Sequence, residues 1–445
     1  MSNRAIGYDG QRQIGMVIGP VVVLGGGIAG IESSLCLSKQ GVRVYLLERR
    51  PSLGGNVSFL SKVFPTLDPA SDILEGMFKE LRSSENVQMM TNVEIKAIER
   101  KEEGFELEVL KRPRHVDPNK CTSCGKCAEA CPVEYDREHE LGIGKRKAID
   151  SPSPKPFPEA FVIDEGACLH FRGEECRACV EACPNDAINL DERPEEIRIQ
   201  AKALILATGM ELFEVSRVKE FGYGRYKDVI TSLELERLLD PRGPTGGEVI
   251  RPSDRKRPRS VAFVLCAGSR DRRFLRHCCR IGCMTALKQA YEIKELYGDE
   301  VEVYICYNDI RASGRMHEEF YQTARGSGIV MLHGIPSEVR EKDGKLTLRV
   351  FDLGTWKLEE LEVDLVVLIP GVNGSSHAKE VGEKLGILVE EDTFFSALDQ
   401  VRSNETKVDG VFLSGCSAGP MDIASSISHA RAAALIVLNY LMKRK

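Results

Sequence analysis

The sequence predicts an α/β protein: two doubly wound units with parallel sheets, and a cysteine-rich α+β module inserted into the first unit. Short β-branched runs that end in or near glycine recur along the chain, a pattern typical of buried parallel strands. The first run leads directly into a glycine-rich turn and a helical pattern. Eight of the 15 cysteines fall between residues 121 and 183, which marks the module. Later strands are expected at 203–209, 260–265, 301–306, 364–371 and 410–415.

Composition excludes several classes of protein. The 445 residues suffice for two to three domains, and 42% hydrophobic with 29% charged residues is typical of a soluble globular protein. A net charge of −6 offers no basic stripe for nucleic acid. Residues 1–15 lack the pattern of a signal peptide, and the most apolar segments are shorter than the ~20 residues that cross a bilayer, so we expect no direct membrane insertion. Clustered cysteines without a secretion signal predict metal or redox chemistry in the cytoplasm.

The first 50 residues have the strand, turn, helix, strand order of a dinucleotide site. Gly25, Gly27 and Gly30 form a G-x-G-x-x-G turn after the strand, and Glu48 ends the second strand. Such glycines let the backbone approach a pyrophosphate at the helix N-terminus, and the acid accepts hydrogen bonds from a ribose hydroxyl. The alternative is a glycine turn that packs helix on sheet without a ligand. The motif alone admits NAD as well as FAD.

Three further stretches resemble the flavoprotein superfamily with two dinucleotide-binding domains, and they favour FAD. They are "ERRPSLGG" after the second strand, "LILATG" at 204–209 and "VDGVFLSGC" at 408–416. In that superfamily the last strand usually ends in Gly-Asp, so a cysteine stands here in the place of the acid that holds the flavin. The predicted cofactor-binding residues are Gly25, Gly27, Ile28, Ala29, Gly30, Glu48, Arg49, Gly54, Gly55, Asn56, Ala207, Thr208, Gly209, Gly415, Cys416 and Ile423.

The inserted module carries the most specific motif in the chain. "CTSCGKCAEACP" (121–132) has bacterial ferredoxin spacing, and "CLHFRGEECRACVEACP" (168–184) repeats it with a wider first gap. Zinc is the alternative metal, which the double arrangement with Pro132 and Pro184 disfavours. In two-cluster ferredoxins the fourth cysteine of each run ligates the other cluster. We therefore assign one [4Fe–4S] cluster to Cys121, Cys124, Cys127 and Cys183, and a second to Cys168, Cys176, Cys179 and Cys131.

A second cysteine group stands where a nicotinamide site would carry glycines. "CAGSRDRRFLRHCCRIGC" (266–283) follows the apolar run at 260–265, so a pyridine nucleotide site is not expected there. Every Cys-x-x-Cys lies in the module, which leaves no disulfide-reductase dithiol. Cys36 and Cys306 are expected in the core, and the basic run is expected in a solvated loop, with a flavin phosphate or a partner as alternatives. A third cluster and inert buried thiols both remain open for Cys266, Cys278, Cys279 and Cys283.

These features divide the chain into six segments, because loops between strands are where insertions are tolerated best. The FAD-binding domain is predicted over 1–112, 193–240 and 373–445, the inserted ferredoxin-like module over 113–192, a linker over 241–259, and a second α/β domain with a degenerate NAD(P) site over 260–372.

Taken together, the motifs resemble the HdrA family, the flavin-containing iron–sulfur subunits of heterodisulfide reductase, whose relatives include flavin subunits of the quinone-interacting membrane-bound oxidoreductase. They run from "GGGIAGIESSL" through "VFPTLD", the ferredoxin insertion, "GPTGGEVIRPSD" and "CAGSRD" to "GCSAGPMDI", nearly the whole chain. The resemblance implies a thioredoxin-reductase-like FAD core that exchanges electrons with iron–sulfur clusters, in some members by flavin-based bifurcation. It also implies that Lys288 lies near the reactive flavin nitrogen, where a cation stabilises the reduced form. A surface lysine is the alternative.

The sequence departs from that family pattern in several places. It lacks the N-terminal domain and the C-terminal ferredoxin domain of long members, which implies fewer clusters. Residues 69–72 are Pro-Ala-Ser-Asp where the family often has cysteines. The family has Cys-x3-Cys-Cys-Met in its second cysteine group, whereas here Gly282 precedes Cys283 and Met284. The third cluster could therefore be incomplete.

The predicted function is that of an oxidoreductase: an FAD- and [4Fe–4S]-containing electron-transfer subunit of a heterodisulfide-reductase-like complex. Its expected partners are the other subunits of that complex, or a ferredoxin, a hydrogenase or a quinone module. One alternative is an NAD(P)H-dependent oxidoreductase of the glutamate synthase small-subunit type, whose ferredoxin part is N-terminal rather than inserted. Another is an assembly scaffold with an inert flavin.

Overall fold

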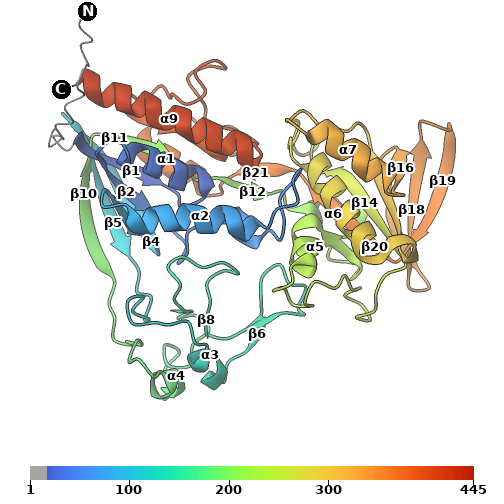
Figure 1. Ribbon diagram of the computed structural model, residues 1–445, viewed down its shortest axis with the longest axis horizontal. Helices are drawn as coiled ribbons and strands as arrows, with labels where there is room; N and C mark the ends of the chain where they lie inside the picture. Colours follow the sequence, from blue (N-terminus) through green and yellow to red (C-terminus); the bar gives the residue numbers. More distant parts are fainter. Residues whose placement is uncertain (1–17, 445) are drawn as a thin grey trace, which may run out of the picture.

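The computed structural model describes residues 18–444 of the chain. The prediction about a signal peptide concerns residues 1–15 and lies outside this range. The described chain forms two α/β units side by side, with the cysteine-rich module below them (Figure 1). The predicted α/β class, with doubly wound parallel sheets, is confirmed.

The first unit is built on a five-stranded parallel sheet in the order β22-β11-β1-β2-β3. Side chains of β1 alternate between its two faces: Val21 and Val23 pack towards the helices, and Val22 and Leu24 towards a second sheet. That second, antiparallel sheet has the order β10-β5-β4. The elements are β1 (Ile18–Leu24), α1 (Ile28–Ser38), β2 (Val42–Leu47), α2 (Ala70–Ser83), β3 (Val87–Met90), β4 (Val93–Lys101), β5 (Gly104–Lys111), β10 (Glu195–Ala201), β11 (Ala203–Leu206), α8 (Ala378–Leu385), β22 (Val411–Leu413) and α9 (Ile423–Lys443).

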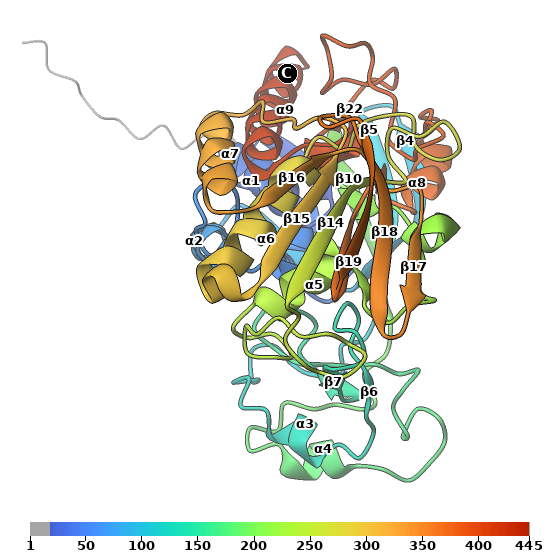
Figure 2. The ribbon, with the colours of Figure 1, turned by 90° about the vertical axis from the view of Figure 1, so that its right-hand side faces the viewer.

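The second unit repeats this plan (Figure 2). Its parallel sheet has the order β13-β20-β14-β15-β16, with helices on one face and the antiparallel meander β17-β18-β19 on the other. The elements are β13 (Val229–Thr231), α5 (Ser232–Leu239), β14 (Ser260–Ala267), α6 (Gly282–Tyr297), β15 (Glu302–Tyr307), α7 (His317–Gly326), β16 (Val330–His333), β17 (Val339–Lys342), β18 (Lys345–Asp352), β19 (Lys357–Val363) and β20 (Leu365–Pro370).

The domain boundaries predicted at residues 240 and 259 need correction. β13 pairs in parallel with β20, and α5 packs into the core of the second unit, so residues 229–239 fold with that unit. The stretch predicted as a linker, 241–259, contains no helix or strand and follows α5 within the second unit. A three-residue strand is too short for its sheet to be read from sequence, which explains the difference. The two units are joined by β12 (Met210–Leu212) and β21 (Val372–Gly374), which pair antiparallel.

The module leaves the first unit after β5 and returns at β10, two strands that pair with each other. Its short elements are α3 (Lys126–Ala130), β6 (Tyr135–Asp136), β7 (Lys145–Arg146), β8 (Ile149–Asp150), β9 (Val162–Ile163) and α4 (Ala178–Ala182). It contacts both units. Phe157 stacks on Phe78 of α2 with ring centroids 4.5 Å apart, and Glu140 accepts hydrogen bonds at 3.3 Å from the buried Arg237 of α5.

None of the helices described between residues 18 and 444 combines the length and the apolar character needed to cross a membrane.

Candidate functional site

The glycine turn between β1 and α1 forms one wall of a large cavity. Gly25 has a φ of 115°, which side chains rarely adopt, and the turn brings Gly27 to the N-cap of α1. A Cβ on Gly27 would meet no atom of another residue closer than 3.9 Å, so space for a ligand opens there. The first backbone N–H groups of a helix bind anions well, so this wall is suited to a pyrophosphate.

Two predicted cofactor-binding residues lie behind the wall. A Cβ on Gly30 would lie 1.8 Å from the Gly25 carbonyl oxygen, and one on Gly415 would lie 2.4 Å from Cβ of Ala29. Both glycines therefore let the strand ends and α1 pack closely. The structure gives them this supporting place, whereas the other fourteen predicted cofactor-binding residues line the cavity.

Glu48 stands at the carboxyl end of β2, at the edge of the cavity. Its carboxylate accepts hydrogen bonds from the backbone N–H groups of Gly26 (2.6 Å) and Arg50 (2.7 Å). Burial raises the pKa of the Glu48 carboxyl, and the two N–H donors oppose that shift. The carboxylate is thus fixed where a ribose hydroxyl could donate to it.

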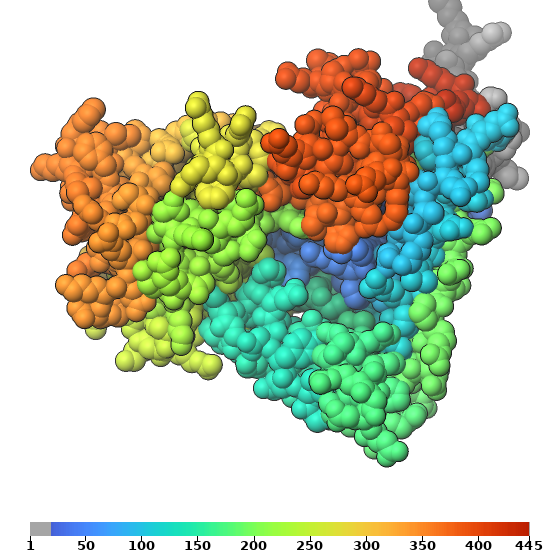
Figure 3. Space-filling view, turned by 180° about the vertical axis from the view of Figure 1, so that it is seen from behind, coloured from blue at the N-terminus to red at the C-terminus, as the bar shows by residue number. Residues whose placement is uncertain are grey.

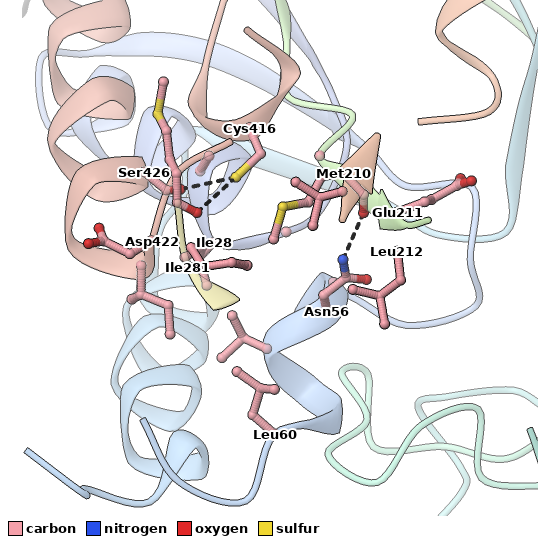
Figure 4. A pocket seen from close by; sticks show the side chains of 18 of the residues that line it. Ile28, Asn56, Leu60, Met210, Glu211, Leu212, Ile281, Cys416, Asp422 and Ser426 are labelled. Carbon is pink, nitrogen blue, oxygen red and sulfur yellow. Dashed lines mark hydrogen bonds between the residues drawn. The ribbon is translucent and has the colours of Figure 1, made fainter. Parts of the chain in front are cut away.

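The opposite wall comes from the ends of β11 and β22 and from the short helix that starts at Gly55. Asn56 donates a hydrogen bond to the Met210 carbonyl at 2.8 Å, and the Cys416 thiol lies 3.4 Å from the Ser426 hydroxyl (Figure 4). The Thr208 hydroxyl is buried and has no hydrogen-bond partner among the described residues. Buried polar groups are rarely left unpaired, so this hydroxyl is suited to a ligand.

The cavity has a volume of about 1100 Å³ and extends from the first unit to the face of the second. Ligand sites typically measure about 300–1,000 Å³, so the space suits a large cofactor. The residues present fit a flavin dinucleotide on three counts: the glycine wall, the fixed Glu48 carboxylate and the unpaired Thr208 hydroxyl.

Lys288 lies at the far end of the cavity, and its side chain is 3% exposed. The alternative of a surface lysine is therefore excluded. Its ammonium contacts the Glu236 carboxylate at 2.5 and 2.6 Å and donates to the Lys62 carbonyl at 3.0 Å. Glu292 lies 3.5 Å away, and burial raises the pKa of its carboxyl. One ammonium thus holds two buried carboxylates at the cavity wall.

The four cysteines that follow β14 surround one small cavity. Two of the thiols accept backbone hydrogen bonds at 3.3 Å: Cys278 from Arg280 N–H and Cys279 from Gly282 N–H. A Cβ on Gly282 would lie 2.9 Å from the Cys279 sulfur, so only glycine fits there. Arg280 and Gly282 line this cavity and the large one, which places the two sites on either side of a single short loop. The thiols around the small cavity are Cys266, Cys278, Cys279 and Cys283.

This loop also leaves no cradle for a nicotinamide dinucleotide. Gly268 is closed off by Phe213, whose ring a Cβ would meet at 2.2 Å. Cys266 itself has a φ of 60°, a left-handed conformation that is uncommon outside glycine.

In the module, the eight cysteines form two groups. Cys131, Cys168, Cys176 and Cys179 line one cavity, and these are the four assigned to the second cluster. Burial raises the pKa of Cys179 to about 11, and negative charge on the other three thiols raises it further. Burial likewise raises the pKa of Cys127 to about 12, with contributions from Cys121, Cys179 and Cys183. Cys124 is exposed.

Sequence patterns missed two histidines of the large cavity. His139 comes from the module and packs edge-on against Phe59, with ring centroids 5.9 Å apart. His429 comes from α9 and accepts a hydrogen bond from Gly415 N–H at 3.0 Å. Neither lies in a motif, and the signal for His429 was only its helical spacing after Cys416. Cys306 is fully buried in β15, and Cys36 is half-buried.

The fold and site define a flavoprotein with two dinucleotide-type units and an inserted ferredoxin-type module. Residues 20–115 match the FAD dependent oxidoreductase family, and residues 114–134 match the 4Fe-4S binding domain. The prediction of FAD and [4Fe–4S] cofactors is confirmed by these matches. Thioredoxin reductases of T. acidophilum (TM-score 0.50, 14% identity) and Lactococcus lactis (TM-score 0.52, 13% identity) share the fold; each comparison covers 96% of this chain, and 98% and 99% of theirs.

The chain is homologous to HdrA, the iron–sulfur flavoprotein of heterodisulfide reductase. It is 41% identical over 421 residues to the HdrA of Methanocaldococcus jannaschii, an iron–sulfur subunit of CoB–CoM heterodisulfide reductase, covering 94% of this chain and 63% of that protein. It is 39% identical to the corresponding subunit of the ferredoxin:CoB–CoM heterodisulfide reductase of Methanosarcina mazei, covering 95% of this chain and 53% of that protein. The resemblance recognised in the sequence is thereby confirmed, over a chain that spans less than two thirds of these relatives.

Proposed function

We propose that this chain is the flavin- and iron–sulfur-containing electron-transfer subunit of a cytoplasmic, heterodisulfide-reductase-like complex. The observation that carries the proposal is the shared loop at Arg280 and Gly282, which borders both the large cavity and the small cavity with four thiols. Bound FAD supplies one- and two-electron chemistry, and each iron–sulfur cluster supplies one-electron chemistry. A protein that separates these sites by one loop is suited to exchanging electrons between them.

The residues of the chain have distinct roles in this proposal. The fourteen lining residues named above would hold FAD, with the glycine turn at its pyrophosphate and Glu48 at a ribose. Lys288 would present a fixed positive charge at the far end of the cavity, and Glu236 would hold it in place. Burial of this pair keeps water away from the charge, which strengthens its field.

We assign a third [4Fe–4S] cluster to Cys266, Cys278, Cys279 and Cys283. Backbone N–H donors to thiolates favour a reduced, more negative cluster, and two of the four sulfurs accept such bonds. Gly282 supports the assignment, because the absent side chain makes room for the Cys279 sulfur. The module would hold the other two clusters.

Partner proteins would supply and accept the electrons. The M. jannaschii and M. mazei relatives are named as components of reductases, and the second name includes ferredoxin. A ferredoxin, a hydrogenase or a quinone module are candidate partners here. The chemistry on the disulfide would take place on a partner, because each Cys-x-x-Cys pair lies in the module.

The test is anaerobic purification of the whole chain, followed by flavin extraction, iron analysis and redox titration. The proposal expects FAD together with iron, and a flavin and clusters that titrate reversibly. A chain with neither cofactor contradicts it. A flavin that stays oxidised while the clusters are reduced supports a scaffold, and rapid flavin bleaching by NADPH alone supports the NAD(P)H-dependent alternative. Copurifying proteins then identify the partners.

A further inference from the structure

The loop around the four-thiol cavity carries an unusual density of positive charge. Within residues 266–283 there are five arginines and one aspartate, in a chain whose net charge is −6. The arginines are Arg270, Arg272, Arg273, Arg276 and Arg280, and Arg311 from the loop after β15 joins them at the cavity wall. We refer to these six residues as the basic rim.

Local carboxylates neutralise only part of the basic rim. Arg270 and Arg311 share Asp309, and Arg273 pairs with Asp271 and Glu220. Between residues 18 and 444, no carboxylate lies within ion-pair distance of Arg272, Arg276 or Arg280, and all three are exposed. Charges that are merely solvated need no such concentration at one place on an acidic chain.

The rim is held in shape by backbone hydrogen bonds. Arg270 N–H donates to the His277 carbonyl at 3.1 Å, Asp271 N–H to the Leu275 carbonyl at 2.9 Å, and Leu275 N–H to the Gly268 carbonyl at 3.1 Å. The loop is therefore a tight double-backed turn. The turn lies on the surface, in yellow, beside the orange C-terminal segments (Figure 3), and the contact of His277 with Asp392 at 3.2 Å agrees with this placement.

The rim and the thiols belong to the same small cavity. Arg270, Arg280 and Arg311 line it together with the four cysteines. Cys278 is half-buried, so the cavity lies close under the surface that the exposed arginines cover. A redox site near a positively charged surface favours association with a negatively charged carrier, because complementary potentials raise the rate of productive encounter.

We infer that the basic rim is the docking surface for an acidic electron-carrier protein that exchanges electrons at the four-thiol site. This inference rests on the proposed function, since it requires a redox centre there. A small acidic protein fits better than nucleic acid, because the positive charge is confined to one loop rather than drawn out along a stripe.

The test uses the anaerobic holoprotein and an acidic bacterial-type 2[4Fe–4S] ferredoxin as the probe. The variant Arg272→Glu/Arg276→Glu reverses two exposed charges that touch neither the thiols nor the large cavity. Arg43→Glu/Lys79→Glu is the matched control, because it reverses two exposed charges on β2 and α2 of the first unit. Iron and flavin are measured in every preparation, and probe binding and electron-transfer rate are measured at low and high salt.

The rim variant is expected to slow association at low salt by about tenfold or more, and to lose most of its salt dependence. The control is expected to change both by less than about twofold. Equal effects in the two variants would overturn the docking surface. Failure of the proposed function has a different result: the wild-type chain would lack cofactors, or would exchange no electrons with small reductants either.

Discussion

The loops that follow β1 and β14 occupy equivalent places in two units with the same plan, yet they differ in chemistry. Each comes at the end of a parallel strand and leads into a helix, and each unit has helices on one face of its sheet and three antiparallel strands on the other. After β1 the loop is glycine-rich and opens into a large cavity. After β14 it is longer, basic and cysteine-rich, and it surrounds a small one.

The difference teaches that the fold fixes where a ligand binds, and that the loop fixes which ligand. Carboxyl ends of parallel strands meet at one edge of a sheet, which favours a site there in both units. Glycines expose backbone N–H groups to a phosphate, whereas thiols present sulfur ligands to a metal. A cavity wall shared by the two loops then couples the sites.

The largest effect is expected where α6 of the second unit contributes a charge to the first site. Lys288→Met leaves the buried Glu236 carboxylate unpaired, and should destabilise the protein by about 3–5 kcal/mol. The double variant Lys288→Met/Glu236→Leu should recover most of that loss, because neither charge then remains buried alone. Denaturant unfolding of both proteins measures the difference, and a single variant as stable as the double would contradict the ion-pair role.

The glycine loop should fail when its close backbone packing is disturbed. Gly30→Ala places a Cβ 1.8 Å from the Gly25 carbonyl oxygen, so the turn must open. We expect loss of bound flavin and about 1–3 kcal/mol of stability. Gly76→Ala in α2 is the control, because nothing lies within 4 Å of its Cβ. Flavin absorbance per chain is the measurement, and equal flavin in both variants would count against the site.

The cysteine loop should fail without affecting the flavin. Gly282→Ala forces the Cys279 sulfur away from a Cβ that would otherwise lie 2.9 Å from it. We expect the loss of about four iron atoms per chain, the content of one cubane, with flavin retained. Cys36→Ser is the control, since this thiol lies on α1 and faces Glu32. Retention of all iron would show that the Gly282 position does not support a cluster.

The smallest effect concerns the second carboxylate at Lys288. Burial raises the pKa of Glu292 in the folded protein, so its contribution to stability is present below the ordinary glutamate pKa of about 4.3 and is lost as pH rises. Glu292→Gln should therefore gain stability relative to wild type as pH rises, by about 1 kcal/mol or less. Melting curves at about pH 5.5 and about pH 8 measure this trend. A gain that shrinks on going to the higher pH would contradict it.

Sequence reasoning succeeded where chemistry is local. The turn at Gly25, Gly27 and Gly30 and the two ferredoxin runs are each contained in fewer than about 20 residues, so spacing alone specifies them. The homology to the HdrA proteins of heterodisulfide reductase followed from the order of such motifs, and it is confirmed.

Sequence reasoning failed where contacts join distant segments. Glu236 lies 52 residues from Lys288, and nothing near either residue indicates the pair. His139 reaches the cavity only because the module packs under the first unit. β13 joins the second sheet through pairing with β20, and the short run Val229–Thr231 gives no signal of its sheet.

Iron per flavin in the anaerobically purified chain tests the central claim most directly, namely that the loop after β14 holds a cluster while the loop after β1 holds the flavin. The account predicts about twelve iron atoms per flavin in the wild type and about eight in Cys283→Ser, since each cubane holds about four. About eight in both proteins, with flavin unchanged, would contradict it.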